Sequence, residues 1–225
     1  MCGRGSLTKV ESELEERFDA DFYSEDLERY NPLPSFNIAP THWHPVITQG
    51  DKRHYNYLKW GLIPFWAKDM SIGSKMINAR IEGLLEKPFF KSALEKRRCL
   101  VPMDGFYEWK KGVGKIKTPL RIQTTNQEVF FMAGIYDSWK SPEGKTIPSF
   151  SIITMPANEF MKPIHDRMPC ILLPEEERLW LEEGMSIQDS LHLLKPYPDE
   201  WMRAYEVSSM VNNVRNNDAS LVVPI

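Results

Sequence analysis

The sequence lacks the features that mark membrane-spanning, secreted or disulfide-stabilised proteins. No apolar run approaches the ~18 residues of a transmembrane helix, and no signal peptide opens the chain. Its three cysteines, Cys2, Cys99 and Cys170, are odd in number and widely spaced, which indicates neither a disulfide framework nor a zinc site. His42 and His44 form an HxH pair without a third ligand nearby, so we predict no metal and no other cofactor. We therefore expect a cytoplasmic protein that does not contact a membrane.

Internal repeats, heptads and low-complexity linkers are also missing, and neither sign of charge dominates. The 225 residues are 42% hydrophobic and 26% charged, which is typical of a globular chain, and we expect one domain over residues 1–225. A formal net charge of −3 argues against non-specific coating of nucleic acid, although it permits a local basic groove. Residues 110–121 include lysines and no acidic residue, and we predict a solvated hairpin that is the most basic strip of the chain.

Apolar periodicity predicts short helices around a set of strands. A capping-box pattern at Thr8 favours an amphipathic helix over residues 8–19, and Pro88 suits the start of a helix over residues 88–98. The basic face of this second helix carries Lys91, Lys96, Arg97 and Arg98. Further helices are expected at 175–183 and 187–194.

The expected strands are rich in Val, Ile, Phe and Tyr, and they cover residues 44–49, 54–60, 99–103, 106–110, 120–123, 129–136, 149–154 and 203–207. These strands neither alternate regularly with helices nor stand all together in the chain. The pattern predicts an α+β fold, with a mostly antiparallel, barrel-like β-sheet core and several peripheral helices.

The first residues carry the most reactive group of the chain. Removal of Met1 leaves Cys2 as the N-terminus, with a thiol and an α-amine on neighbouring atoms. Such groups have ordinary pKa values of about 8.5 and about 7.7–8.0, so each is partly available as nucleophile or base at neutral pH. The pair can attack an amide, or it can condense with an aldehyde to give a thiazolidine. The alternative is a frayed terminus without a role.

Three other stretches place polar side chains inside apolar sequence. Asn78 and Arg80 point the same way in an extended segment and can hold a phosphate or carboxylate, unless they are an ordinary turn Asn and surface Arg. Glu108 lies between two aromatic residues, where a desolvated carboxylate can exchange protons near neutrality, or it faces outward from an edge strand. His165 lies between two prolines that stiffen its backbone, which suits either proton transfer or a structural role.

Taken in order, the motifs resemble those of one family. They are Met1-Cys2-Gly3-Arg4, Phe36-Asn37-Ile38-Ala39-Pro40, Trp60-Gly61-Leu62-Ile63-Pro64-Phe65-Trp66-Ala67, Asn78-Ala79-Arg80, Gly105-Phe106-Tyr107-Glu108-Trp109 and His165-Asp166-Arg167-Met168-Pro169. They are similar to the SRAP (SOS-response-associated peptidase) family of abasic-site-processing proteins, over essentially the whole chain. The resemblance implies an SRAP-like fold and covalent capture of abasic sites in single-stranded DNA.

The resemblance also implies catalytic roles. Cys2 would form a thiazolidine crosslink with the ring-opened sugar after Met1 is removed, and Glu108 would shuttle the protons. Asn78 and Arg80 would seat the sugar and its phosphate, and His165 would assist ring opening. The family name further implies peptidase activity, including removal of the residue before Cys2.

For DNA binding the resemblance implies a second set of residues. Asn37, Pro40 and Trp66 are similar to the loop residues with which the family contacts DNA, and Trp66 suits a wedge or stacking platform. Arg4 would add a phosphate contact beside Asn78 and Arg80. We expect a monomer, associated with the nucleoid when it is on DNA.

Two alternatives come from other classes. Class II glutamine amidotransferases also begin Met-Cys-Gly, but the His-Arg-Gly stretch and Asn-Gly turn expected there do not occur in this sequence. A non-covalent single-strand-binding module would keep full activity without the Cys2 thiol, and it would leave Glu108 and His165 unexplained.

Overall fold

The computed structural model describes residues 2–30, 32–112 and 117–225. The strands are β1 (Gly5–Leu7), β2 (Asp21–Phe22), β3 (Ser35–Ile38), β4 (Trp43–Thr48), β5 (Asp51–Trp60), β6 (Asn78–Arg80), β7 (Arg98–Met103), β8 (Gly105–Lys111), β9 (Lys117–Thr124), β10 (Phe130–Lys140), β11 (Thr146–Pro156), β12 (Arg167–Pro169) and β13 (Met202–Glu206). The helices are α1 (Glu11–Phe18), α2 (Ser24–Tyr30), α3 (Pro88–Lys96), α4 (Pro174–Trp180) and α5 (Ile187–His192), with short 3-10 segments between them.

Five strands close into a barrel. β5, β4, β7, β10 and β11 are antiparallel neighbours in that order, and a parallel pairing of β11 with β5 at Phe150 and Trp60 closes the ring. β2, β6 and β12 extend this sheet at its margins. The predicted α+β fold with a mostly antiparallel, barrel-like core is therefore confirmed.

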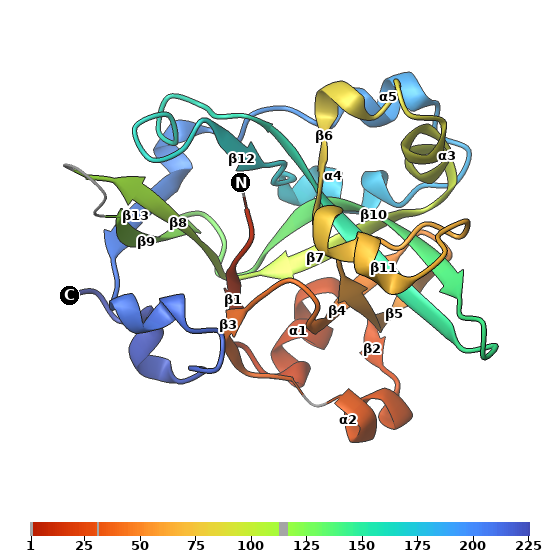
Figure 1. The fold of residues 1–225 in the computed structure, drawn as a ribbon. Helices are drawn as coiled ribbons and strands as arrows, with labels where there is room; N and C mark the ends of the chain where they lie inside the picture. Colours follow the sequence, from red (N-terminus) through yellow and green to blue (C-terminus); the bar gives the residue numbers. More distant parts are fainter. Residues whose placement is uncertain (1, 31, 113–116) are drawn as a thin grey trace.

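A second, five-stranded sheet is antiparallel throughout and has the order β13-β9-β8-β1-β3. Figure 1 shows β1 in the middle of the molecule, with β8, β9 and β13 of this sheet on one side and the barrel strand β7 on the other. One hydrophobic cluster includes side chains of both sheets, such as Leu7 and Phe106 from the first and Leu100 and Phe131 from the barrel. This shared core fixes the N-terminal strand against both sheets.

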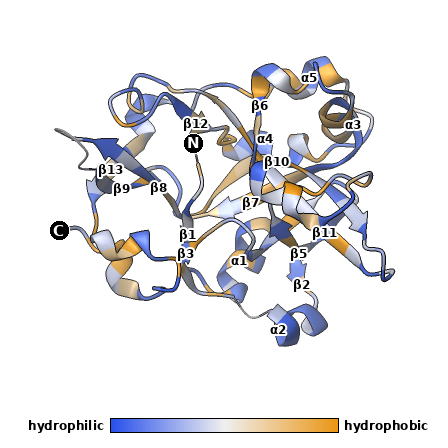
Figure 2. Cartoon of the chain, in the orientation of Figure 1, coloured by the Kyte–Doolittle hydropathy of each residue, from blue (hydrophilic) through white to orange (hydrophobic). Residues whose placement is uncertain are grey.

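The structure corrects several sequence-based boundaries. α1 begins three residues later than predicted, and α2, β1, β2 and β12 were not predicted. α2 has no buried residue and is mostly hydrophilic in Figure 2, so it offers no apolar period to detect. The predicted basic strip lies partly outside the described residues, and its last residue, Arg121, is buried and paired with Asp104 at 2.8 Å. No helix among the described residues combines the length and apolar character that crossing a membrane requires.

Arg98 differs most from its predicted position. It was expected on the basic face of a helix that runs to residue 98, but α3 ends at Lys96, and Arg98 opens β7 with a fully buried side chain. Its guanidinium donates to the carbonyl oxygens of Leu94, Glu95, Trp180 and Glu182, at 2.7, 3.1, 2.6 and 2.5 Å. These carbonyls belong to the C-terminal ends of α3 and α4, where helices leave acceptors unpaired. Arg98 therefore joins two helix ends to the barrel.

We expect Arg98→Met to destabilise the protein by about 3 kcal/mol or more, because several buried carbonyls lose their donor together. Urea unfolding followed by far-UV circular dichroism measures this change. Lys96→Met is the matched control, since Lys96 is exposed and two residues away, and it should shift the midpoint very little. Equal midpoints for the two variants would show that Arg98 does not join the helices to the barrel.

Candidate active site beside the N-terminal cysteine

Cys2 lies in the interior of the protein. Its side chain is 1% exposed, and the segment that follows it enters β1 between β3 and β8. The backbone N–H of Tyr107 donates to the carbonyl oxygen of Arg4 at 3.0 Å, which ties this segment to β8. Burial raises the pKa of the Cys2 thiol, and the nearby Glu108 carboxylate raises it further. The thiol is thus held protonated at neutral pH next to a group that can accept its proton.

Glu108 points into the protein. β8 is an inner strand between β1 and β9, and Glu108 is 4% exposed. Side chains alternate along β8, so Glu108 shares a face with Phe106 of the main core, whereas Tyr107 and Trp109 pack in a smaller cluster on the other face. The alternative that Glu108 faces outward from an edge strand is therefore wrong.

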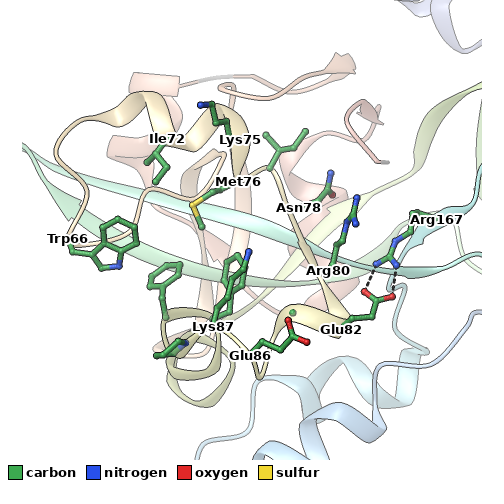
Figure 3. A pocket seen from close by; sticks show the side chains of 15 residues that line it. Trp66, Ile72, Lys75, Met76, Asn78, Arg80, Glu82, Glu86, Lys87 and Arg167 are labelled. Atoms are coloured by element: carbon green, nitrogen blue, oxygen red, sulfur yellow. Dashed lines mark hydrogen bonds and ion pairs between the residues drawn. The ribbon is translucent and has the colours of Figure 1, made fainter.

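Asn78 contacts the reactive residue directly. Its side-chain nitrogen Nδ2 donates to the Cys2 carbonyl oxygen at 2.8 Å, and its Oδ1 atom is buried with no hydrogen-bond partner among the described residues. β6 pairs in parallel with β11, and Ala79 between the two polar residues is fully buried. Asn78 and Arg80 consequently lie on one face, as the spacing predicted, and both line the same cavity (Figure 3).

That cavity has a volume of about 1040 Å³ and is open to solvent. Its lining includes the aromatic residues Trp66, Phe89 and Phe90 and the basic residues Lys75, Arg80, Lys87 and Arg167. Trp66 is 56% exposed and lies edge-on to Phe89, with ring centroids 6.3 Å apart. In Figure 3, Trp66 lies at one end of the cavity and Arg167 at the other, with Asn78 and Arg80 on the side of Arg167. Aromatic and cationic side chains along one groove suit an extended polyanion with flat bases.

His165 lies just before β12, in the chain that returns from β11. Its Nδ1 atom accepts a hydrogen bond from the Arg167 backbone N–H at 2.9 Å and lies 2.8 Å from Asp166 Oδ1. Two residues later the same segment supplies Arg167 to the cavity wall. The ring is thus held in a fixed orientation, as the flanking prolines suggested.

Arg4 and Asn37, expected at the DNA surface, lie in an internal network. Arg4 donates to Asn37 Oδ1 at 2.9 Å and to the Val211 carbonyl, and its guanidinium lies 5.6 Å from the Trp109 ring centroid. Asn37 is 1% exposed, and its Nδ2 donates to three carbonyls of the segment 211–216. Pro40 is half-buried in a turn beside Thr41. These contacts favour positioning roles for Arg4 and Asn37, and their direct contact with DNA stays a prediction.

Both histidines of the HxH pair contact the backbone. His44 is buried, with Nε2 2.8 Å from the Pro102 carbonyl oxygen, and burial lowers its pKa to about 4. His42 Nδ1 accepts from the Ala39 backbone N–H. The described part of the chain contains no group of three or more side chains suited to hold a metal.

Sequence reasoning gave no role to Glu82 or Arg167, which meet at the end of the cavity. Glu82 is two residues after Arg80, a spacing that in a continuing strand would have placed it on the same face. The chain instead turns into a 3-10 segment at Ile81–Gly83, so the two-residue alternation of a strand does not predict the position of Glu82.

Fold and site together define an α+β protein with a closed mixed barrel, whose buried second residue is a cysteine next to a carboxylate. The family model of the SOS response associated peptidase (SRAP) family matches residues 1–214, and the chain belongs to this family. It is 44% identical over 224 residues to the abasic site processing protein YoqW of Bacillus subtilis, with 99% of each chain covered. It is 30% identical to the abasic site processing protein HMCES of Xenopus tropicalis, covering 100% of this chain and 78% of that one. A crystal structure of a Bacteroides thetaiotaomicron protein superposes with a TM-score of 0.91 at 30% identity, over 100% of both chains.

Proposed function

We propose that this chain is an abasic-site processing protein, which binds single-stranded DNA and joins Cys2 covalently to an abasic sugar. The observation that carries the proposal is the placement of Cys2, which is held by Asn78 of the cavity wall and interacts with Glu108. The relatives named as abasic site processing proteins support the substrate. In this proposal the protein acts as one domain over residues 1–225, as a monomer in the cytoplasm that is on the nucleoid when bound to DNA.

The proposed reaction begins when removal of Met1 frees the α-amine of Cys2. The amine attacks the aldehyde carbon of the ring-opened sugar, and loss of one water molecule gives a Schiff base. The thiol sulfur then adds to the same carbon as its proton leaves, and the double-bonded nitrogen becomes an amine again. The product is a thiazolidine ring with one new C–N bond and one new C–S bond.

The surrounding residues supply the proton transfers and the positioning. Because the buried thiol is held protonated, a base is needed, and in this proposal the nearby Glu108 carboxylate takes the proton and protonates the leaving hydroxyl. Asn78 fixes the main chain of Cys2 by its 2.8 Å hydrogen bond, Arg80 pairs with a phosphate, and His165 assists opening of the sugar ring. Trp66 is sufficiently exposed to stack on a base next to the lesion. The Cys2 thiol also suits a peptidase step that removes Met1.

The test is a denaturing-gel assay with a single-stranded oligonucleotide that carries one abasic site. We expect a shifted band with protein lacking Met1, and none with protein that keeps it, because the retained residue turns the α-amine into a peptide nitrogen. The matched DNA control carries an abasic site reduced to the alcohol, which has no aldehyde to trap. A stable adduct with the reduced site, or none with the aldehyde and free Cys2, would contradict the proposal.

A further inference from the structure

The cavity wall carries an ion pair that the proposed reaction does not use. Arg167 and Glu82 meet through two parallel contacts, with Nη1 2.5 Å from Oε1 and Nη2 3.0 Å from Oε2 (Figure 3). Arg167 Nη2 also donates to the Thr154 carbonyl oxygen at 2.7 Å. The Arg167 side chain is 12% exposed and that of Glu82 is 52% exposed. The guanidinium is therefore fixed to the protein, and the carboxylate lies on its open side.

This two-bond geometry is the one that a phosphate group would use. Arginine binds carboxylates and phosphates by the same pair of parallel N–H donors, so the two anions compete for one edge of the guanidinium. Glu82 occupies that edge of Arg167. Arg80, two residues earlier, is exposed in the same cavity. A strand that lies along the cavity thus meets one exposed guanidinium and one that is covered by the protein's own carboxylate.

The carboxylate remains an anion throughout the neutral pH range. The hydrogen bond from Arg167 lowers the pKa of Glu82, and Arg80 contributes in the same direction. The competition for Arg167 therefore does not depend on pH near neutrality. It depends on whether an incoming phosphate can displace the carboxylate, which is free to swing into solvent because half of it is exposed.

We propose that Glu82 is a specificity-determining residue, whose carboxylate occupies the phosphate-binding edge of Arg167 and must be displaced before DNA seats fully. The inference rests on the proposed DNA-binding function of the cavity. An intact strand has only non-covalent contacts with which to displace Glu82, so it stays weakly bound. A strand with an abasic site is retained by the bond to Cys2, which compensates for the displacement. Glu82 thereby increases the difference in retention between strands with an abasic site and intact strands.

The experiment measures binding of an intact single strand to the wild type, Glu82→Gln and Glu86→Gln, by fluorescence anisotropy over a series of salt concentrations. Glu86 is the matched control, because it lines the same cavity and loses the same charge, and no ion pair joins it to Arg167 among the described residues. We expect Glu82→Gln to bind about fivefold more tightly and Glu86→Gln to change Kd less than about twofold. One additional phosphate contact should also make the slope of log K against log[salt] steeper by about 0.7 in Glu82→Gln alone.

A second background isolates the role of Arg167. In Arg167→Met protein, Glu82→Gln should have no larger effect than Glu86→Gln, because no covered guanidinium remains to be released. Thermal unfolding of each variant shows that the compared proteins are folded. The adduct yield on abasic DNA relative to the retention of intact strands should fall in Glu82→Gln.

Two results would overturn the inference. If Glu82→Gln and Glu86→Gln increase the affinity for intact strands equally, the increase comes from the loss of a negative charge in general. If Glu82→Gln binds less tightly at unchanged melting temperature, the ion pair with Glu82 instead holds Arg167 in position for binding. Either result together with normal crosslinking by the wild type removes only this inference. Failure of the wild type both to crosslink abasic DNA and to bind intact strands removes the proposed function as well.

Discussion

Replacing Cys2 by alanine should abolish the adduct that survives a denaturing gel, and it should leave non-covalent DNA binding intact. A variant prepared without Met1 keeps the α-amine of residue 2, so a Schiff base with the abasic aldehyde can still form. That imine returns to amine and aldehyde by addition of water, whereas the thiol of the wild type closes the ring and retains the sugar. We expect the stable adduct to fall below detection.

Chemical trapping separates the two functions of Cys2. Adding cyanoborohydride reduces the imine to a secondary amine, so Cys2→Ala should regain a gel-stable adduct under this condition alone. Cys170→Ala is the matched control, because Cys170 is also a buried free thiol but lies in the barrel region, and it should crosslink like the wild type. A full yield from Cys2→Ala without reductant would favour a reaction that needs only the amine.

The parts of the site that sequence predicts well depend on local geometry. Asn78 and Arg80 are two residues apart, and a strand puts such residues on one face whatever the rest of the chain does. The same holds for His165, whose ring is fixed by neighbours within two residues. Local spacing therefore gave both the residues and their orientation.

The parts that sequence could not predict depend on contacts between distant segments. Arg167 and Glu82 are 85 residues apart, and nothing in either local pattern indicates the pair. Asn37 is buried because a segment 174 to 179 residues later closes over it. Arg98 lies in a basic run typical of a solvated helix end, yet the C-terminal ends of two helices converge on it. Burial and partners of polar residues are tertiary properties that no periodicity records.

Sequence also does not decide which way Glu108 points, because alternation along β8 allows either face of the strand to be the inner one. The tertiary structure decides it: β1 and β9 pair with both edges of β8, and the face that carries Phe106 and Glu108 packs toward the main core. Its burial then has a chemical consequence that can be measured, because a charge next to a thiol changes both proton transfer and thiol acidity.

Glu108→Gln should slow adduct formation by about 100-fold, the usual contribution of a positioned general acid–base group. It should also make Cys2 more reactive toward iodoacetamide at fixed pH. The Glu108 charge is one of the two main causes that raise the Cys2 pKa, and removing it lowers that pKa and increases the thiolate fraction. Single-turnover gels and alkylation followed by mass spectrometry measure the two rates on the same protein preparation.

The opposite directions of these two changes are what identify Glu108 as a proton-transfer group. If Glu108 had only a structural role, Glu108→Gln would loosen the site and expose Cys2 more. The alkylation and crosslinking rates would then both respond to that exposure, and the loss would not be confined to crosslinking. Glu108→Asp keeps the charge on a shorter side chain, so it should leave the alkylation rate near that of the wild type and recover part of the crosslinking rate. Slower alkylation and slower crosslinking together in Glu108→Gln would instead mean that the carboxylate acts as a base on the thiol in both reactions, and that this outweighs the effect of its charge on the Cys2 pKa.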